Sequence, residues 1–193
     1  MTQYNFERLS VLLVEDNNYV RNTFHQLLRH FGVGRVLLAQ NGAQAVESLK
    51  IPGGGDIIIS ALVMSPIDGL LLLRWVRESK DSPNRFTPFI MLSGAADSHY
   101  VQAARDKGVS EFLAKPFSAE TVYTHLLKVI DQPRPYIATQ SYFGPDRRRK
   151  DGEPPEGEER RVTRDSDITL VYSSDKIVKS DKPSEVWKFV LPN

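Results

Sequence analysis

The first two thirds of the chain alternate short apolar runs with segments whose apolar residues recur at helical spacing. A continuous apolar run such as SVLLV at residues 10–14 is typical of a strand buried on both faces, and apolar residues at i, i+3, i+4 and i+7 are typical of an amphipathic helix. The pattern predicts strands at residues 10–14, 36–38, 56–60, 89–92 and 111–114. It predicts helices at residues 17–31, 43–49, 68–79, 97–107 and 118–130.

Strands that alternate with helices in this way predict a parallel sheet with helices on both faces. The expected α/β fold is flavodoxin-like and doubly wound, with five strands in the order 2-1-3-4-5. In such folds the functional site lies at the carboxyl ends of the strands. The candidate site residues are therefore those that end or follow the predicted strands: Glu15, Asp16, Ser60, Ala61, Ser93, Gly94, Lys115 and Pro116.

The composition changes after Asp131. Residues 133–166 are rich in Pro and Gly, and residues 134–165 include eight basic and seven acidic side chains. A segment of this composition has little to bury, which predicts a solvated linker. Apolar residues return at 167–193, but a segment of fewer than about 30 residues makes too small a core to fold alone. We therefore expect a domain at residues 1–132, a charged linker at 133–166, and a largely irregular C-terminal segment at 167–193 that forms short strands or docks.

Charge and composition exclude several classes of function. The chain has 25 basic and 24 acidic residues, so its net charge of +1 gives no general attraction for nucleic acid. The basic run RRRK at 147–150 has no interleaved aromatic residues and is interpreted as part of the linker. The absence of cysteine excludes disulfides and thiol catalysis. No signal sequence and no apolar run near the ~20 residues of a membrane helix are found, so we expect a cytoplasmic protein without membrane contact.

Five motifs, in this order, resemble the response-regulator receiver family of two-component signal transduction over residues 8–131. They are VLLVED with Glu15 and Asp16, AQNGAQAV, IDGLLLLRWVR, MLSG with Ser93, and LAKPF with Lys115. In that family the acidic pair helps to hold a magnesium ion, and an aspartate at the end of the third strand accepts a phosphoryl group. The resemblance implies that Ser93 and Lys115 stand where the family contacts this group. Phe112 stands at the position of a switch aromatic, although a core aromatic is the simpler interpretation.

The sequence departs from the family at the third strand. Counting back from Asp68 places Ala61 at the phosphoacceptor position. Asp56 does not replace the missing aspartate, because five residues at ~3.3 Å each put it roughly 16 Å away at the other edge of the sheet. Ser60 is adjacent, but its side chain is expected to point to the opposite face. Since alanine cannot form an acyl phosphate, we interpret the domain as a degenerate receiver.

The missing carboxylate also affects the metal site. Magnesium is bound by oxygen ligands, so Glu15 and Asp16 alone are expected to bind it more weakly than a complete site, with residual binding left open. Two origins of Ala61 remain open, a natural loss and an engineered Asp-to-Ala variant of an ordinary receiver. The unusual Ser65-Pro66 sequence in the following loop favours natural loss.

The sequence thus predicts a signalling protein that acts by phosphorylation-independent protein–protein contact and not by catalysis. By resemblance, the contact surface lies at residues 97–130 and binds a histidine kinase, a phosphotransfer protein or a downstream signalling protein; a homodimer is left open. One alternative is a transcriptional or nucleic-acid-binding regulator with output through residues 167–193, where no helix-turn-helix pattern is found. Another is a phosphotransfer enzyme that uses Ser60, which the expected direction of that side chain disfavours.

Overall fold

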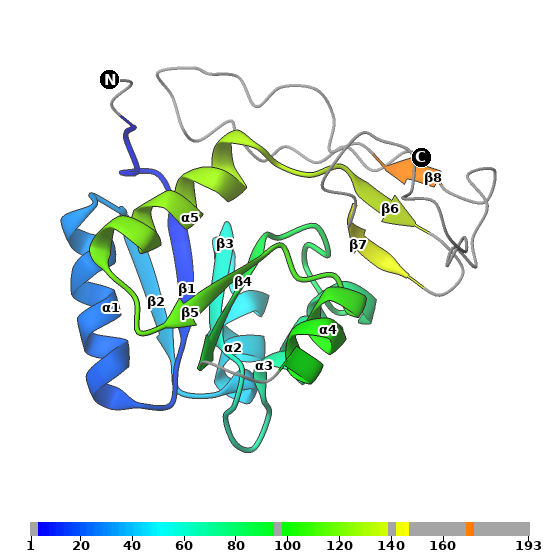
Figure 1. The fold of residues 1–193 in the computed structure, drawn as a ribbon, viewed down its shortest axis with the longest axis horizontal. Helices are drawn as coiled ribbons and strands as arrows, with labels where there is room; N and C mark the ends of the chain where they lie inside the picture. The colour runs from blue at the N-terminus through cyan, green and yellow to red at the C-terminus, as the bar shows by residue number, and fades with distance from the viewer. Residues whose placement is uncertain (1–3, 95–97, 139–141, 147–168, 172–193) are drawn as a thin grey trace.

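In the computed structural model the five predicted strands form one parallel sheet in the order β2-β1-β3-β4-β5 (Figure 1). The structure describes residues 4–94, 98–138, 142–146 and 169–171. The strands of this sheet are β1 (Ser10–Val14), β2 (Arg35–Ala39), β3 (Ile57–Ala61), β4 (Phe89–Gly94) and β5 (Glu111–Lys115). The helices are α1 (Asn18–His30), α2 (Gly42–Lys50), α3 (Gly69–Glu78), α4 (Ser98–Asp106) and α5 (Ala119–Asp131). The predicted flavodoxin-like fold and strand order are confirmed.

The helices cover both faces of the sheet, which explains why its central strands are mostly apolar. Every residue of β1 and β3 is buried. Phe24 and Leu28 of α1 and Leu126 of α5 are fully buried in one core cluster. Leu72 and Leu73 of α3 are fully buried in a second cluster, which also includes residues of α2 and α4. Removing such side chains from water is the main source of the stability of this unit.

Polar residues at the start of two helices fix where these helices begin. The Asn17 side chain accepts a hydrogen bond from the Val20 N–H at 3.1 Å and caps α1. Ser118 caps α5 and forms a capping box with Thr121, as the sequence predicts for Ser118. Each cap satisfies main-chain donors that the first turn of a helix leaves without partners.

The sequence predicts a solvated linker from residue 133, and the structure differs at its start. β6 (Tyr136–Ala138) and β7 (Phe143–Pro145) form an antiparallel pair that packs on the receiver-like unit. Tyr136 and Ile137 are only 6% and 7% exposed. Two three-residue strands among charged and proline residues are too short to show a hydrophobic period, so the sequence pattern missed them. The folded unit therefore extends beyond the predicted boundary at residue 132.

A third short strand comes from the predicted C-terminal segment. β8 (Thr169–Val171) pairs antiparallel with the other edge of β6, which gives a second sheet in the order β7-β6-β8. The prediction of short strands or docking for the rest of the C-terminal segment stays a prediction. Residues 147–168 and 172–193, which make up most of the predicted linker and C-terminal segment, lie outside the described residues. The nucleic-acid-binding alternative for residues 167–193 therefore stays a prediction.

Candidate functional site at the carboxyl edge of the sheet

The strand register brings the predicted site residues to one edge of the sheet. Val14 pairs with Ser60 of β3, so Glu15 and Asp16 emerge beside the end of that strand. Ala61 pairs with Leu92, the residue before Ser93, and Gly94 pairs with Lys115. All these residues therefore lie at the carboxyl ends of adjacent parallel strands, where this type of fold places its functional sites.

A short ion pair connects β5 with the loop after β1 across this edge. The Lys115 Nζ atom lies 2.5 Å from Glu15 Oε2, although the two residues are 100 positions apart in the chain. The Glu15 side chain is only 2% exposed and that of Lys115 is 29% exposed. A carboxylate this deeply buried needs a partner, because transferring an unpaired charge out of water is costly. Lys115 supplies the opposite charge and donates a hydrogen bond to the Glu15 carboxylate.

Main-chain and side-chain contacts hold the acidic loop after β1 in place. The Arg21 guanidinium donates to the carbonyl oxygens of Glu15 at 2.6 Å and Asp16 at 3.3 Å. Its other terminal nitrogen donates to the side chain of Asn18 at 2.9 Å. Arg21 is 8% exposed, and its contacts use the fork of donors that lysine lacks. The sequence analysis missed this positioning residue, although an arginine in the first turn of the helix that follows the acidic pair was a usable signal.

Ala61 is the last residue of β3 and is 2% exposed. Its neighbour Ser60 is fully buried, and the Ser60 Oγ donates to the Ala61 carbonyl at 2.9 Å. The Ser60 hydroxyl is therefore neither exposed nor directed at solvent. Asp56 lies at the opposite edge, where its carboxylate accepts from the Ser10 N–H at 2.8 Å. No carboxylate of β3 reaches the site beside Glu15 and Lys115.

The remaining predicted residues also lie near this edge. Ser93 is 7% exposed, and its Oγ donates to the Gly94 carbonyl at 2.9 Å. Phe112 on β5 is partly buried and packs against the core cluster that contains Leu72 and Leu73. This packing accounts for an aromatic residue at position 112. The roles of Ser93 as a phosphoryl contact and of Phe112 as a switch stay predictions.

The donor set at this edge fits a divalent cation poorly. Glu15 Oε2 is bound to Lys115, and Glu15 Oε1 accepts from the Asn17 N–H at 3.3 Å. Asp16 is exposed and supplies the second carboxylate. Within the described ranges, no group of three or more His, Cys, Asp or Glu side chains is placed to share a metal ion. A magnesium ion at this site would have to compete with Lys115 for Glu15.

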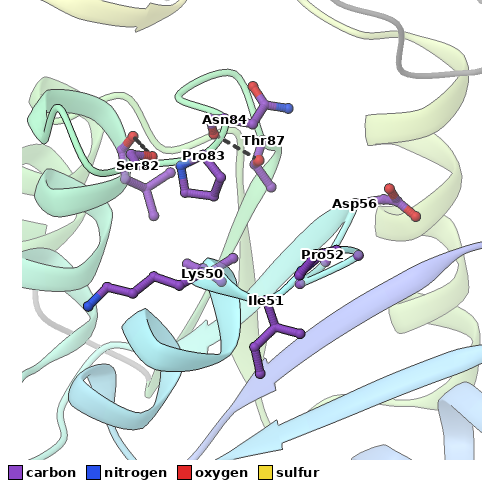
Figure 2. Close-up of a pocket in the computed structure, with 13 residues that line it drawn as sticks. Lys50, Ile51, Pro52, Asp56, Ser82, Pro83, Asn84 and Thr87 are labelled. Carbon is purple, nitrogen blue, oxygen red and sulfur yellow. Dashed lines mark hydrogen bonds between the residues drawn. The ribbon is translucent and has the colours of Figure 1, made fainter.

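A separate pocket of about 420 Å³ lies at the amino edge of the sheet (Figure 2). Its walls are the Gly-rich loop before β3, with Ile51 and Pro52, and the loop before β4, with Pro83. The hydroxyls of Ser82 and Thr87 in the second loop already donate to main-chain carbonyls. The pocket was not predicted from the sequence. It lies at the other end of the sheet from Ala61, so the carboxyl edge remains the candidate site.

Comparisons with known proteins agree with this fold. Residues 11–127 match the family described as the response regulator receiver domain. The chain belongs to this family, whose members are receiver domains of two-component signalling.

Among individual proteins, the chain is similar to the chemotaxis protein CheY of Bacillus subtilis, with 30% identity over 63% of this chain and 97% of that protein. It is also similar to the chemotaxis protein CheY-3 of Vibrio cholerae, with 27% identity over 65% of this chain and 95% of that protein.

Solved structures give the same result. The receiver domain of a sensor histidine kinase from Pseudomonas aeruginosa, solved with a magnesium ion in its active-site cleft, has 29% identity and a TM-score of 0.55. The comparison covers 62% of this chain and 95% of that domain. The signal receiver domain of a histidine kinase from Syntrophus aciditrophicus has 26% identity and a TM-score of 0.58 over 65% and 92% of the two chains.

None of the helices in the described part of the chain is long and apolar enough to cross a membrane. The cytoplasmic location stays a prediction.

Proposed function

We propose that this receiver signals by phosphorylation-independent protein–protein contact, because Ala61 stands at the position of the phosphoacceptor aspartate. The observation that carries this proposal is the position of Ala61 at the carboxyl end of β3, next to the ion pair of Glu15 and Lys115. A methyl group has no oxygen with which to attack a phosphoryl donor. The two nearest candidates on the same strand segment do not replace it, since Ser60 is buried and Asp56 lies at the other edge.

The ion pair supports the proposal from a second direction. In the family a lysine at the position of Lys115 contacts the phosphoryl group. Here Lys115 is paired with Glu15 within the protein, so the charge of this lysine is balanced without an added anion. Because Lys115 already has a partner without phosphate, the carboxyl ends of β1, β3 and β5 can keep one arrangement in the absence of phosphate. Magnesium, if it binds, is expected to bind weakly for the same reason.

The proposed contact surface is formed by α4, β5 and α5, within residues 97–130. A partner that prefers one arrangement of this surface shifts its population without any covalent step. The partner is expected to be a histidine kinase, a phosphotransfer protein or a downstream signalling protein. Two of the similar structures are themselves receiver domains of histidine kinases, which supports a partner from this class. The protein is not expected to act as an enzyme.

The test compares the wild-type chain with Ala61→Asp and Ala61→Asn after incubation with acetyl phosphate and Mg²⁺. Phosphorylation is followed by intact mass and by Phos-tag mobility, and cleavage by neutral hydroxylamine identifies an acyl phosphate. We expect no labelling of the wild type, labelling of Ala61→Asp, and none of Ala61→Asn, which matches aspartate in shape but cannot form the linkage. Hydroxylamine-labile phosphate on the wild-type chain would overturn the proposal. A folded Ala61→Asp chain that stays unlabelled would show that more than the acceptor has been lost.

A further inference from the structure

The structure assigns a role to the C-terminal hairpin, which we define as β6 (Tyr136–Ala138) and β7 (Phe143–Pro145). We infer that this hairpin is a clasp that holds the loops before β4 and β5 and so fixes the arrangement of α4 and β5. This inference rests on the proposed function, because α4 and β5 belong to the proposed contact surface. It names the element that sets this surface in the absence of phosphate. The hairpin lies beyond the amino ends of β4 and β5 (Figure 1).

An aromatic cluster joins the hairpin to the loop before β4. The Phe86 ring packs edge-on against Tyr136 and Phe143, with ring centroids 5.2 Å and 5.1 Å apart. The Tyr136 hydroxyl donates to the Phe86 carbonyl at 2.7 Å. The Arg85 guanidinium lies over the Phe143 ring, 3.4 Å from its centroid. Buried aromatic pairs and a cation over a ring are specific as well as attractive contacts, so the hairpin docks in one orientation.

The hairpin also touches the loop before β5 through the main chain. A Cβ atom on Gly144 would lie 2.6 Å from Gly108 Cα, and one on Gly108 would lie 2.8 Å from the Phe143 carbonyl oxygen. Both distances are too short for a side chain, so the two glycines allow the backbones to meet. Gly108 also has a positive φ of 84°, which only glycine adopts readily. The contact therefore depends on glycine on both sides.

Arg77 of α3 lies under this junction and connects its parts. The guanidinium is 1% exposed and donates to the Gly108 carbonyl at 3.0 Å, and to those of Arg85 and Thr87 at 2.7 Å and 2.8 Å. It lies 5.4 Å from the centroid of the Tyr136 ring. One buried cation thus links the loop before β4, the loop before β5 and the hairpin. Networks of this kind act as a unit, because loss of one member leaves buried polar groups without partners.

The position of the clasp determines what it restrains. Gly108 follows the last turn of α4 and donates to the Arg105 carbonyl at 3.2 Å, and β5 begins three residues later. A hairpin held against Gly108 therefore limits movement of α4 relative to β5. On its other edge β6 pairs with β8, so the C-terminal segment has a direct connection to the clasp. The C-terminal segment is thus linked through β6 and the clasp to the proposed contact surface, without involving the edge of the sheet that holds Ala61.

The test measures amide hydrogen exchange by mass spectrometry on the full chain without phosphate or partner. Gly144→Ala places a methyl group against Gly108 and should release the hairpin. Tyr136→Phe removes only the hydroxyl, which donates to the Phe86 carbonyl and also interacts with the Ser110 side chain, so it tests the clasp if Gly144→Ala fails to fold. The matched control is Tyr19→Phe, the same change at a side chain that is 80% exposed.

We expect both clasp variants to exchange faster in the loops at residues 84–88 and 107–110, and also in α4 and β5. Gly144→Ala should raise these rates by roughly tenfold or more, since opening of the hairpin exposes amides that it now protects. Strands β1 and β2 and the Tyr19→Phe control should not change. An effect confined to the two loops, or no effect, would overturn the clasp. Because no phosphoryl donor is present, this result is independent of whether the wild-type chain can be phosphorylated.

Discussion

Replacing Lys115 with methionine removes the cation that neutralises Glu15 and keeps much of the apolar length of the side chain. In the folded protein Lys115 Nζ lies 2.5 Å from Glu15 Oε2, and the carboxylate is 2% exposed. After the substitution the Glu15 carboxylate keeps the main-chain donor of Asn17 at 3.3 Å but loses its charged partner. Unfolding returns this carboxylate to water, so the substitution favours the unfolded state.

The size of the effect follows from the burial of the two groups. Breaking a fully buried ion pair by removing one partner costs about 3–5 kcal/mol. Lys115 is 29% exposed, which lets water reach the remaining charge and reduces this cost. We therefore expect Lys115→Met to lower the free energy of unfolding by about 2–3 kcal/mol. For a domain of this size, that corresponds to a decrease in Tm of roughly 6–9 °C.

The assay is a double-mutant cycle measured by urea unfolding at pH 7. Glu15→Gln should be milder than Lys115→Met, at about 1 kcal/mol, because it leaves a neutral amide in place of a carboxylate. When Lys115→Met is added to Glu15→Gln, it should lower the free energy of unfolding much less than it does in the wild-type chain. The difference is a coupling energy of about 1–2 kcal/mol. Lys50→Met is the control, because Lys50 pairs with Glu47 at 2.8 Å with both side chains well exposed. That control should not change stability measurably.

Two results would refute this reasoning. If Lys115→Met and Lys50→Met have the same effect, the Lys115 pair behaves as an ordinary surface pair. If the effects of Glu15→Gln and Lys115→Met add without coupling, the two side chains do not interact in solution. Either result would also remove the second line of support for a phosphate-independent site.

Two further predictions concern buried charges elsewhere. Burial raises the pKa of the Asp56 carboxyl, partly opposed by the hydrogen bond from Ser10, so the ionised form is disfavoured in the folded state. The native pKa lies above the unfolded value, so Asp56 costs stability at neutral pH, and this cost disappears as the pH falls through the native pKa. Asp56→Asn should therefore raise the free energy of unfolding at pH 7, measured by urea unfolding, by about 1 kcal/mol or less, and lose most of this advantage near pH 4; a gain that is the same at both pH values would contradict the assignment. Arg77→Lys should cost about 2 kcal/mol, because an ammonium group does not reproduce the fork that reaches three carbonyls. Urea unfolding of Arg77→Lys beside Arg74→Lys, at an exposed arginine of the same helix, checks this, and equal effects would count against it.

The acidic loop after β1 shows what the local sequence predicts and what it does not. The run VLLVED predicts a buried strand that ends in two acidic residues, and the structure places Glu15 and Asp16 directly after β1. The two residues nevertheless lie in different environments, since Glu15 is buried and paired while Asp16 is exposed. Their difference depends on Lys115, which the chain brings to the same edge only after four further strands are in place.

The C-terminal hairpin shows where the sequence pattern failed. The apolar residues of 136–145 fall in two short groups that show no hydrophobic period, within a longer stretch rich in charge, Pro and Gly, so the composition of 133–166 as a whole predicts a solvated linker. Tyr136 becomes buried because Phe86 and Arg77 present a matching surface, and β7 fits because Gly108 has no side chain. Each of these partners is at least 28 positions away in the sequence, and none is detectable from the segment itself.

The sequence by itself determined the α/β class, the strand order and the edge at which the site residues meet, because period and alternation are local properties that a parallel sheet converts into one topology. It also showed alanine, and not aspartate, at position 61. Only the tertiary structure decided that Glu15 is neutralised by Lys115, that Ser60 is enclosed, and that the domain continues through the hairpin. These features depend on contacts between distant residues and on the burial of charge, which are set only when the chain has folded.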